Sequence, residues 1–272
     1  MNIITLTTDF GYRDYSVGAL KGQLYRLLPD VTIVDISHDI ERFNIAEVAY
    51  TLQGAYSHFP NKTIHIIGVN NELNPERPLL ILDYNNHYFI TADNGFISLF
   101  VEEQTPCHIY KVNLKDTCSS FPTLDFSTKV AQLIRLQTPI EEIGTPYQEH
   151  LHITNFLPKV LPNRIEGTII HIDHFGNLVS NITQKLLEKE AKGRKFNVYF
   201  RYESIKNIGL EDIYLQYNQA EEKEIPEGNK ILIFNKLKYL EMTLYKSDPS
   251  SSRSAASLMG IKRGNTMSID FI

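Results

Sequence analysis

The first third of the chain alternates between short β-prone runs and amphipathic helical stretches, and this order most restricts its fold. The β-prone runs are Asn2–Thr7, Val31–Ile36 and Thr63–Val69. Between them, apolar residues recur at helical spacing over Tyr15–Leu28 and over the stretch that begins at Asn44. Strands joined through helices form right-handed crossovers, which place the strands parallel in one sheet. The pattern therefore predicts an α/β domain.

A hairpin and a further helix extend this domain. Leu79–Asp83 and His87–Thr91 are separated by Tyr-Asn-Asn, a turn sequence typical of antiparallel pairing. His108–Val112 is another β-prone run, and Asp125–Leu136 carries apolar side chains on one helical face. We predict an α/β N-terminal domain with a mainly parallel sheet over residues 1–150.

The second half of the sequence is rich in short β-prone runs. Residues 144–162 contain many turn-forming residues and break the earlier pattern, so we place the domain boundary there. Short strands at regular spacing are typical of a small barrel or sandwich, and we predict a C-terminal β-barrel domain over residues 163–272. The segment Lys246–Arg253 is expected to be an exposed loop. The candidate strands are Ile165–Ile172, Leu178–Ile182, Lys195–Phe200, Asp212–Gln216, Lys230–Phe234, Tyr239–Leu244 and Thr266–Phe271.

Composition and charge limit the classes of partner. No run approaches the roughly 18 consecutive apolar residues that a membrane span needs, and the first residues show no secretion signal. Cys107 and Cys118 do not make a disulfide framework, which is typical of the reducing cytoplasm. A net charge of −5 argues against nucleic-acid binding. We therefore expect a cytoplasmic protein with neither a membrane nor a nucleic acid as partner.

Polar residues that follow predicted strands are the candidates for chemistry. Asp9 follows the first strand directly, at the sheet edge where α/β proteins bind ligands. Its carboxylate can accept two hydrogen bonds from the 2′,3′-diol of a ribose. The alternative is a turn residue that caps the next helix. Asn94, in Ala-Asp-Asn-Gly, follows another strand, but Asn-Gly is typical of a plain turn, so on its own this segment is a weak indication of a site.

Residues 172–177 combine a carboxylate, an imidazole, an aromatic ring, a glycine and an amide between two predicted strands. A bulge or hairpin explains Gly176 and Asn177. It does not require Phe175, because loops rarely expose such a ring without a use. Asp173, Phe175 and Asn177 are therefore candidates for ligand binding.

Four segments occur in the order and spacing of one family. They are TTDFGYRDYSVGALKGQL from Thr7, VDISHDIERFNI from Val34, ADNG from Ala92 and IDHFGNLVSNI from Ile172. In these segments the chain resembles the S-adenosylmethionine (SAM) hydroxide adenosyltransferases, relatives of the fluorinase and chlorinase that use SAM. The resemblance implies an α/β N-terminal domain, a C-terminal β-barrel and a homotrimer that binds SAM between one subunit's N-domain and a neighbour's C-domain. It implies SAM as a small-molecule nucleoside substrate and no cofactor.

The resemblance also assigns roles to individual positions. Asp9 matches the carboxylate that holds the ribose diol, and Phe43 matches an aromatic ring beside the nucleoside. Asp173, Phe175 and Asn177 match positions that contact the adenosine and the methionine chain. The residues expected to bind substrate are Asp9, Phe43, Asn94, Phe121, Thr123, Asp173, Phe175, Asn177 and Asn235.

The catalytic positions depart from the family pattern. The hydrolases of the family use an Asp, an Arg and a His to activate water, and Arg77 matches the Arg. Asn70 stands where the family has the Asp, and Pro122 stands where it has the His. Thr123 lies where a halide-binding hydroxyl can occur, and Asn235 opens the segment that matches N-S-x-G-Y-L. We take Arg77 and Asn70 as the candidate catalytic residues.

Three functions remain open. The first is a SAM hydrolase that releases adenosine and methionine by attack of water at C5′, with Glu72 or Glu76 as a substitute base. The second is a non-catalytic relative that binds SAM or adenosine. The third is a metal-dependent hydrolase, for which residues such as Asp35 and His38 stand near strand ends without a recognised metal-ligand spacing. A lone histidine beside an apolar strand is more often structural, so we predict no metal site.

Overall fold

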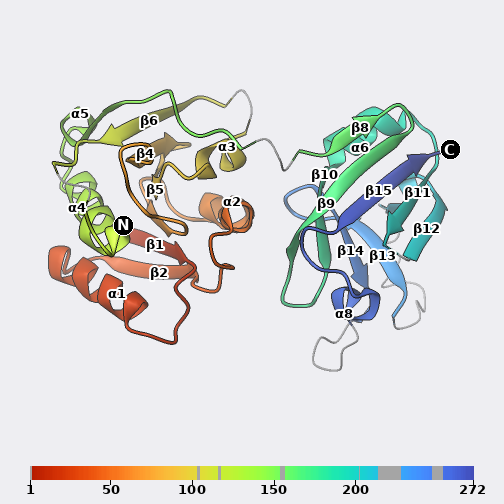
Figure 1. The fold of residues 1–272 in the computed structure, drawn as a ribbon, viewed down its shortest axis with the longest axis horizontal. Helices are drawn as coiled ribbons and strands as arrows, with labels where there is room; N and C mark the ends of the chain where they lie inside the picture. The colour runs from red at the N-terminus through yellow and green to blue at the C-terminus, as the bar shows by residue number, and fades with distance from the viewer. Residues whose placement is uncertain are drawn as a thin grey trace. The chain divides into compact units, whose positions relative to one another are not determined.

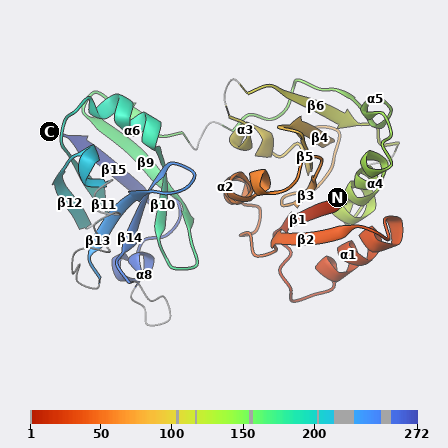
Figure 2. The same ribbon diagram turned by 180° about the vertical axis from the view of Figure 1, so that it is seen from behind.

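The computed structural model describes residues 2–102, 105–115, 118–153, 157–201, 203–213, 228–246 and 254–272. The chain divides into two compact units, Met1–Ile153 and Thr154–Ile272 (Figures 1 and 2). Each unit has its own sheet and its own apolar packing, so each has the anatomy of a separate domain.

The N-terminal unit contains a 7-stranded sheet in the order β2-β1-β3-β5-β4-β6-β7. The pairings β2–β1, β1–β3 and β3–β5 are parallel, whereas β5–β4, β4–β6 and β6–β7 are antiparallel. The sheet is therefore mixed, which corrects the expectation of a mainly parallel one. The β4–β5 hairpin causes the difference. β5 pairs parallel with β3, and each strand beyond β5 then pairs antiparallel with its neighbour. The strands are β1 (Ile3–Thr8), β2 (Thr32–Ser37), β3 (Ile64–Gly68), β4 (Leu79–Tyr84), β5 (His87–Ala92), β6 (Cys107–Val112) and β7 (Gly144–Pro146).

Helices cover both faces of this sheet. One apolar core joins the sheet to α1 (Ser16–Leu27) and α4 (Thr128–Arg135), and a second joins it to α2 (Ile45–Ala55) and α3 (Phe96–Phe100). Alternate residues of each strand point to opposite faces, so β3 contributes to both cores. α2 begins where the sequence predicts, because the Asn44 side chain accepts a hydrogen bond from a backbone N–H of the first turn.

The helix predicted over Asp125–Leu136 begins differently. η2 (Thr123–Ser127) is a π-helical turn, and α4 starts after it. Such turns are rare and often lie at functional sites. The remaining short elements of this unit are η1 (Tyr56–His58) and α5 (Ile140–Ile143).

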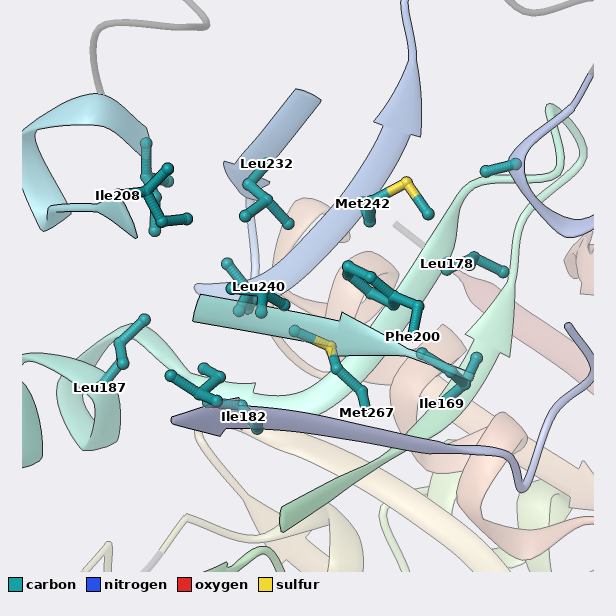
Figure 3. Packing of buried hydrophobic residues seen from close by; sticks show 14 of the residues in the cluster. Ile169, Leu178, Ile182, Leu187, Phe200, Ile208, Leu232, Leu240, Met242 and Met267 are labelled. Atoms are coloured by element: carbon teal, nitrogen blue, oxygen red, sulfur yellow. The ribbon is translucent and has the colours of Figure 1, made fainter. Parts of the chain in front are cut away.

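The C-terminal unit contains an antiparallel, barrel-like sheet in the order β12-β11-β15-β9-β10-β14-β13, with β8 beside β9. Its apolar side chains pack on the inner face, where Leu178, Leu240 and Met267 lie together (Figure 3). The expected C-terminal β-barrel is thereby confirmed as a barrel-like sheet. The strands are β8 (Lys159–Leu161), β9 (Arg164–Ile172), β10 (Leu178–Thr183), β11 (Phe196–Phe200), β12 (Glu203–Ile208), β13 (Lys230–Phe234), β14 (Tyr239–Leu244) and β15 (Thr266–Phe271).

Some expectations for this unit are corrected. The strand expected at Asp212–Gln216 is wrong in its described part, because residues 210–213 form a helical turn. The Asp212 carboxylate accepts a hydrogen bond from the Gly209 N–H at 2.7 Å, an arrangement that favours a helix start. Residues 214–216 and the loop expected beyond Lys246 lie outside the described residues. The helices α6 (Gln184–Ala191) and α8 (Ala255–Met259) were not expected.

Candidate functional site

Polar residues of the N-terminal unit gather at one edge of its sheet. β1, β2, β3 and β5 are parallel, so their carboxyl ends lie at the same edge. Asp9 follows β1, His38 follows β2, Asn70 and Asn71 lie just after β3, and Asn94 lies just after β5. Open α/β sheets bind their ligands at this edge. The structure thus brings Asp9, Asn70 and Asn94, all expected from the sequence, to one edge.

Asp9 and Phe43 contact each other at this edge. The Phe43 N–H donates a hydrogen bond to Asp9 Oδ2 at 2.9 Å. Phe43 has a positive φ of 62°, a conformation that costs a residue other than glycine roughly 1–2 kcal/mol. It is 66% exposed although its side chain is apolar. A strained, exposed aromatic residue beside a fixed carboxylate is the kind of arrangement found at ligand sites.

Asn71 ties three elements together, and the sequence interpretation did not single it out. Its Nδ2 donates to Thr123 Oγ1 at 3.0 Å, and its Oδ1 accepts from the Ala92 N–H at 2.6 Å. The side chain is buried, as is Thr123, so β3, β5 and η2 are held against one another. The only signal in the sequence is a second asparagine beside Asn70, because both partners of Asn71 are distant along the chain.

Asn94 organises the edge after β5. Its Nδ2 donates to the Val69 carbonyl at 2.9 Å, and its Oδ1 accepts from the Phe96 N–H at 3.0 Å. Asn94 thereby links β3 to the start of α3. The neighbouring Asp93 accepts a hydrogen bond from the Leu151 N–H at 2.8 Å. Both side chains are buried and hold the edge in shape.

The segment from Asn70 to Arg77 is a tight loop after β3. Asn70 has a positive φ of 46°, which asparagine tolerates better than most residues. Asn74 Oδ1 accepts the N–H groups of Glu76 and Arg77, each at 2.9 Å. Glu72 and Glu76 are exposed, and Arg77 is half-buried. The two candidate catalytic residues are therefore held at opposite ends of one short loop.

Phe121 also lies at this edge. Its ring packs edge to face on Phe10, with the ring centroids 5.3 Å apart, a geometry that aromatic pairs favour. Phe10 directly follows Asp9, so the structure brings Phe121 to the same region as the carboxylate.

A series of side chains in hydrogen-bond or ion-pair contact lies next to Asp9. Thr8 Oγ1 is 2.7 Å from His38 Nδ1, and His38 Nε2 is 3.1 Å from Asp35 Oδ1. Asp35 Oδ2 accepts hydrogen bonds from Lys21 Nζ at 2.5 Å and from the Tyr12 hydroxyl at 3.1 Å. Burial raises the pKa of the Asp35 carboxyl, but the hydrogen bonds from Lys21 and His38 outweigh burial and hold that pKa below its usual value.

In the C-terminal unit, the turn between β9 and β10 folds around Asp173. Asp173 Oδ1 accepts the Asn177 N–H at 2.8 Å, and its Oδ2 accepts from Asn177 Nδ2 at 2.9 Å. Asn177 Oδ1 accepts the Thr243 hydroxyl of β14 at 2.5 Å. Phe175, between them in the turn, is 60% exposed. The structure therefore brings Asp173, Phe175 and Asn177 together in one turn, with the ring at the surface.

Glu241 is a buried carboxylate that the sequence interpretation missed. It lies on β14 two residues before Thr243, and alternation along a strand places the two on the same face. Asn235 Nδ2 donates to Glu241 Oε2 at 3.2 Å, so Asn235 lies beside it. Burial raises the pKa of Glu241 against the hydrogen bond from Asn235, and the nearby Asp173 charge raises it further.

The described residues offer neither a metal-binding cluster nor a membrane-crossing helix. Among the residues that the structure describes, no group of three or more His, Cys, Asp or Glu side chains is placed to hold a metal ion. Across the same ranges, no helix combines the length and apolar character required to cross a bilayer.

Both units match models of one protein family. The model for the SAM hydroxide adenosyltransferase N-terminal domain matches residues 4–144, and the model for the C-terminal domain matches residues 167–268. The chain belongs to the SAM hydroxide adenosyltransferase family. The resemblance inferred from the sequence motifs is thereby confirmed, and the SAM hydroxide adenosyltransferase match includes both the Asp9 edge and the Asp173 turn.

Relatives in the SAM hydroxide adenosyltransferase family include two kinds of enzyme. The (R)-S-adenosyl-L-methionine hydrolase of Methanocaldococcus jannaschii is 31% identical over 189 residues, which cover 67% of each chain. The fluorinase of Actinopolyspora mzabensis is 23% identical over 296 residues, covering 94% of this chain and 92% of the fluorinase. The relatives thus support SAM-processing activity at the level of the family.

Solved structures share the fold over the whole chain. A conserved protein from Thermotoga maritima has a TM-score of 0.79 at 22% identity, covering 98% of this chain and 99% of its own. A conserved protein from Thermus thermophilus has a TM-score of 0.70 at 19% identity and covers 100% of both chains. At these identities the likeness supports the fold alone.

Proposed function

We propose that this protein binds SAM at the Asp9–Phe43 edge and hydrolyses it to adenosine and methionine. The main structural support for this proposal is the hydrogen bond from the Phe43 N–H to the Asp9 carboxylate. It fixes a strong acceptor beside an exposed ring at the edge where α/β sheets bind ligands. The similarity to the (R)-S-adenosyl-L-methionine hydrolase of Methanocaldococcus jannaschii supports this choice of substrate.

Asp9 suits the ribose of a nucleoside. An ionised carboxylate offers about four lone-pair positions on its two oxygens, so one hydrogen bond to Phe43 is compatible with acceptance of two ribose hydroxyls. The exposed Phe43 ring provides an apolar surface for the nucleoside beside that carboxylate. Together the two residues orient the sugar, and orientation contributes much of the rate of a displacement that requires in-line attack.

The turn of the C-terminal unit suits the remainder of SAM. SAM carries a sulfonium cation, and an aromatic face attracts a cation by about 0.5–2 kcal/mol. We assign this role to the exposed Phe175. Asp173 and Asn177, which hold each other through two hydrogen bonds, supply the polar groups of the same turn. We propose that this turn contributes to the recognition of SAM.

The proposed reaction is a displacement at C5′ of the ribose. The oxygen of water forms a bond to C5′ while the bond between C5′ and sulfur breaks. Sulfur keeps the electron pair of that bond and leaves as the neutral thioether of methionine. The attacking water loses one proton to a base or to solvent, and adenosine is the other product. The leaving group needs no proton, so activation of water is the difficult part.

Asn70 and Pro122 stand where the hydrolases of the family have an Asp and a His, so we expect slow hydrolysis of SAM. An amide does not act as a base, and proline offers no side-chain proton acceptor. General-base catalysis contributes a factor of about 10²–10⁴ to the rate, so loss of the base should slow hydrolysis by up to that factor. Glu72 and Glu76 are exposed carboxylates on the loop that leads to Arg77. We propose that one of these two glutamates takes the proton.

A second candidate function is binding of SAM or adenosine without cleavage. The amide at Asn70 and the proline at Pro122 favour it, because both changes remove a catalytic group and leave the Asp9 edge intact. In this case the protein would hold the nucleoside, and no products would form.

Product analysis and calorimetry separate these functions. Hydrolysis predicts that incubation with SAM releases adenosine and methionine in equal amounts, measured by liquid chromatography. Asp9→Asn should abolish release and weaken binding, whereas Asp30→Asn, a matched change of an exposed carboxylate between α1 and β2, should change neither. Binding without products supports the second candidate. Absence of binding of both SAM and adenosine at millimolar concentration contradicts both.

Two further expectations from the sequence stay predictions. The homotrimer predicts a mass in light scattering near three times that of the 31.3 kDa chain. The cytoplasmic location predicts that the protein remains in the soluble fraction of gently lysed cells that express it.

A further inference from the structure

The four contacting side chains Lys21–Asp35–His38–Thr8 form a chain next to the carboxylate of the proposed site. We propose that this chain is a positioning device, which through the Thr8 hydroxyl fixes the Asp9 carboxylate in the orientation that receives a ribose diol. The inference rests on the proposed function, because it assumes that Asp9 binds the ribose.

Thr8 and His38 also accept hydrogen bonds from backbone N–H groups next to Asp9. Thr8 Oγ1 accepts the Phe10 N–H at 3.3 Å, and the His38 carbonyl accepts the Gly11 N–H at 2.8 Å. Thr8, which precedes Asp9, and Phe10 and Gly11, which follow it, are therefore all held by hydrogen bonds of Thr8 or His38. Thr8 and His38 are 0% and 1% exposed, so water does not compete for these contacts and each hydrogen bond is more directional.

The contacts of these side chains suit the following arrangement of protons. An ionised Asp35 only accepts hydrogen bonds, so His38 Nε2 carries the proton that faces it, and His38 Nδ1 accepts from the Thr8 hydroxyl. Thr8 Oγ1 then has a lone pair for the Phe10 N–H. Lys21 completes the chain by donating to Asp35. The Thr8 hydroxyl thus has the His38 ring on one side and the Phe10 N–H on the other, and these two contacts hold its rotamer and the turn that follows it.

The same strand offers a matched control. Thr5 Oγ1 is 2.7 Å from His65 Nδ1, and both residues are 0% exposed. Thr5 lies three residues before Thr8 on β1, in the interior of the strand and away from its carboxyl end. Replacing either threonine by valine removes a buried hydroxyl from an imidazole at the same distance. A purely structural role predicts the same effect on ligand binding for both changes.

The test compares two probes that differ only in the ribose hydroxyls. Calorimetry measures the affinity of the full chain and its variants for adenosine and for 2′,3′-dideoxyadenosine. We expect Thr8→Val to lower the affinity for adenosine about tenfold, which corresponds to the loss of one hydrogen bond to a charged group. The affinity for 2′,3′-dideoxyadenosine should change less than about twofold. Thr5→Val should leave the ratio of the two affinities as in the wild type. Thr8→Ser, which keeps the hydroxyl, should restore that ratio.

His38 variants provide a second reading if a threonine variant unfolds. His38→Asn keeps a side-chain acceptor near Thr8, whereas His38→Gln extends toward Asp35 instead, so the asparagine variant should retain more of the preference for adenosine. If the wild type prefers adenosine and Thr8→Val has the same ratio of affinities for the two probes, the inference is overturned and the proposed function is unaffected. Wild-type protein that binds neither probe overturns the proposed function and this inference with it.

Discussion

His65 makes the N-terminal unit sensitive to acid. The side chain is fully buried on β3, stacked on Phe89 with the ring centroids 4.6 Å apart. Its ring nitrogens lie 2.7 Å from Thr5 Oγ1 and 3.1 Å from His87 Nδ1. Burial lowers the pKa of His65 from 6.5 to about 3, and the neighbouring His87 adds to this decrease. The fold therefore requires a neutral imidazole at this position.

The size of the effect follows from proton linkage. Below pH 6.5 the unfolded chain binds a proton at His65, whereas the folded chain does so only near pH 3. The stabilisation is complete above pH 6.5 and is lost as the pH falls toward 3. Each pH unit in this window costs about 1.4 kcal/mol, so the free energy of unfolding at pH 5 should be about 2 kcal/mol lower than at pH 8. Burial also lowers the pKa of His87, which adds to the loss.

The assay must report the N-terminal unit alone. Urea titrations at pH 8, 6.5 and 5, read by pulsed hydrogen exchange of peptides from β3 and β5, give its free energy of unfolding. His65→Gln removes the titrating group and perturbs two buried hydrogen bonds, so we expect lower stability at pH 8 by about 1–3 kcal/mol. The decrease between pH 8 and pH 5 should shrink by about 2 kcal/mol. His108→Gln removes an exposed imidazole on β6 and should keep the wild-type decrease.

If His65→Gln folds and loses as much stability between pH 8 and pH 5 as the wild type, His65 does not control the acid response. A wild-type protein whose N-terminal unit is equally stable at pH 8 and pH 5 would contradict the reasoning outright.

Three further predictions concern single side chains. Asn70→Asp returns a carboxylate to the family position and should raise the rate of adenosine release from SAM about 10²-fold; an unchanged rate in a folded variant argues against a base at that position. Gly176 has a φ of +74°, and an added Cβ would lie 2.3 Å from the Ser254 side chain, so Gly176→Ala should destabilise the C-terminal unit by roughly 1–3 kcal/mol in urea unfolding. Because burial raises the pKa of Glu241 in the fold, the neutral form is favoured and stability is lost as the pH rises through that pKa. Glu241→Gln should therefore be more stable than the wild type at pH 8 and lose this advantage at pH 4, and a variant less stable at pH 8 would contradict the assignment.

The sequence predicted the elements whose periodicity is local. β1, α1, β2, α2 and β3 follow from alternating apolar runs and helical stripes, and Asn44 caps α2 as expected. The mixed order of the sheet was missed because strand direction depends on which neighbour the β4–β5 hairpin joins. The π-helical turn at Thr123–Ser127 was missed for a related reason. Its Thr123 is held by Asn71, a partner 52 residues away along the chain.

The candidate site was predictable where motifs stand at strand ends. Asp9 and Phe43 were expected as separate ligand residues, but their mutual hydrogen bond is a contact between segments 34 residues apart. Asp173, Phe175 and Asn177 were predictable together because one turn contains all three. Glu241 was missed because a carboxylate inside an apolar strand is typical of a solvent-facing position, and its burial depends on the packing of neighbouring strands.

A crystal structure of the adenosine complex would show whether the Asp9 edge receives the ribose of a nucleoside. We expect both ribose hydroxyls within about 3 Å of the Asp9 carboxylate oxygens, with the nucleoside against the Phe43 ring. Adenosine bound elsewhere on the protein, with its ribose out of hydrogen-bonding reach of Asp9, would contradict the claim.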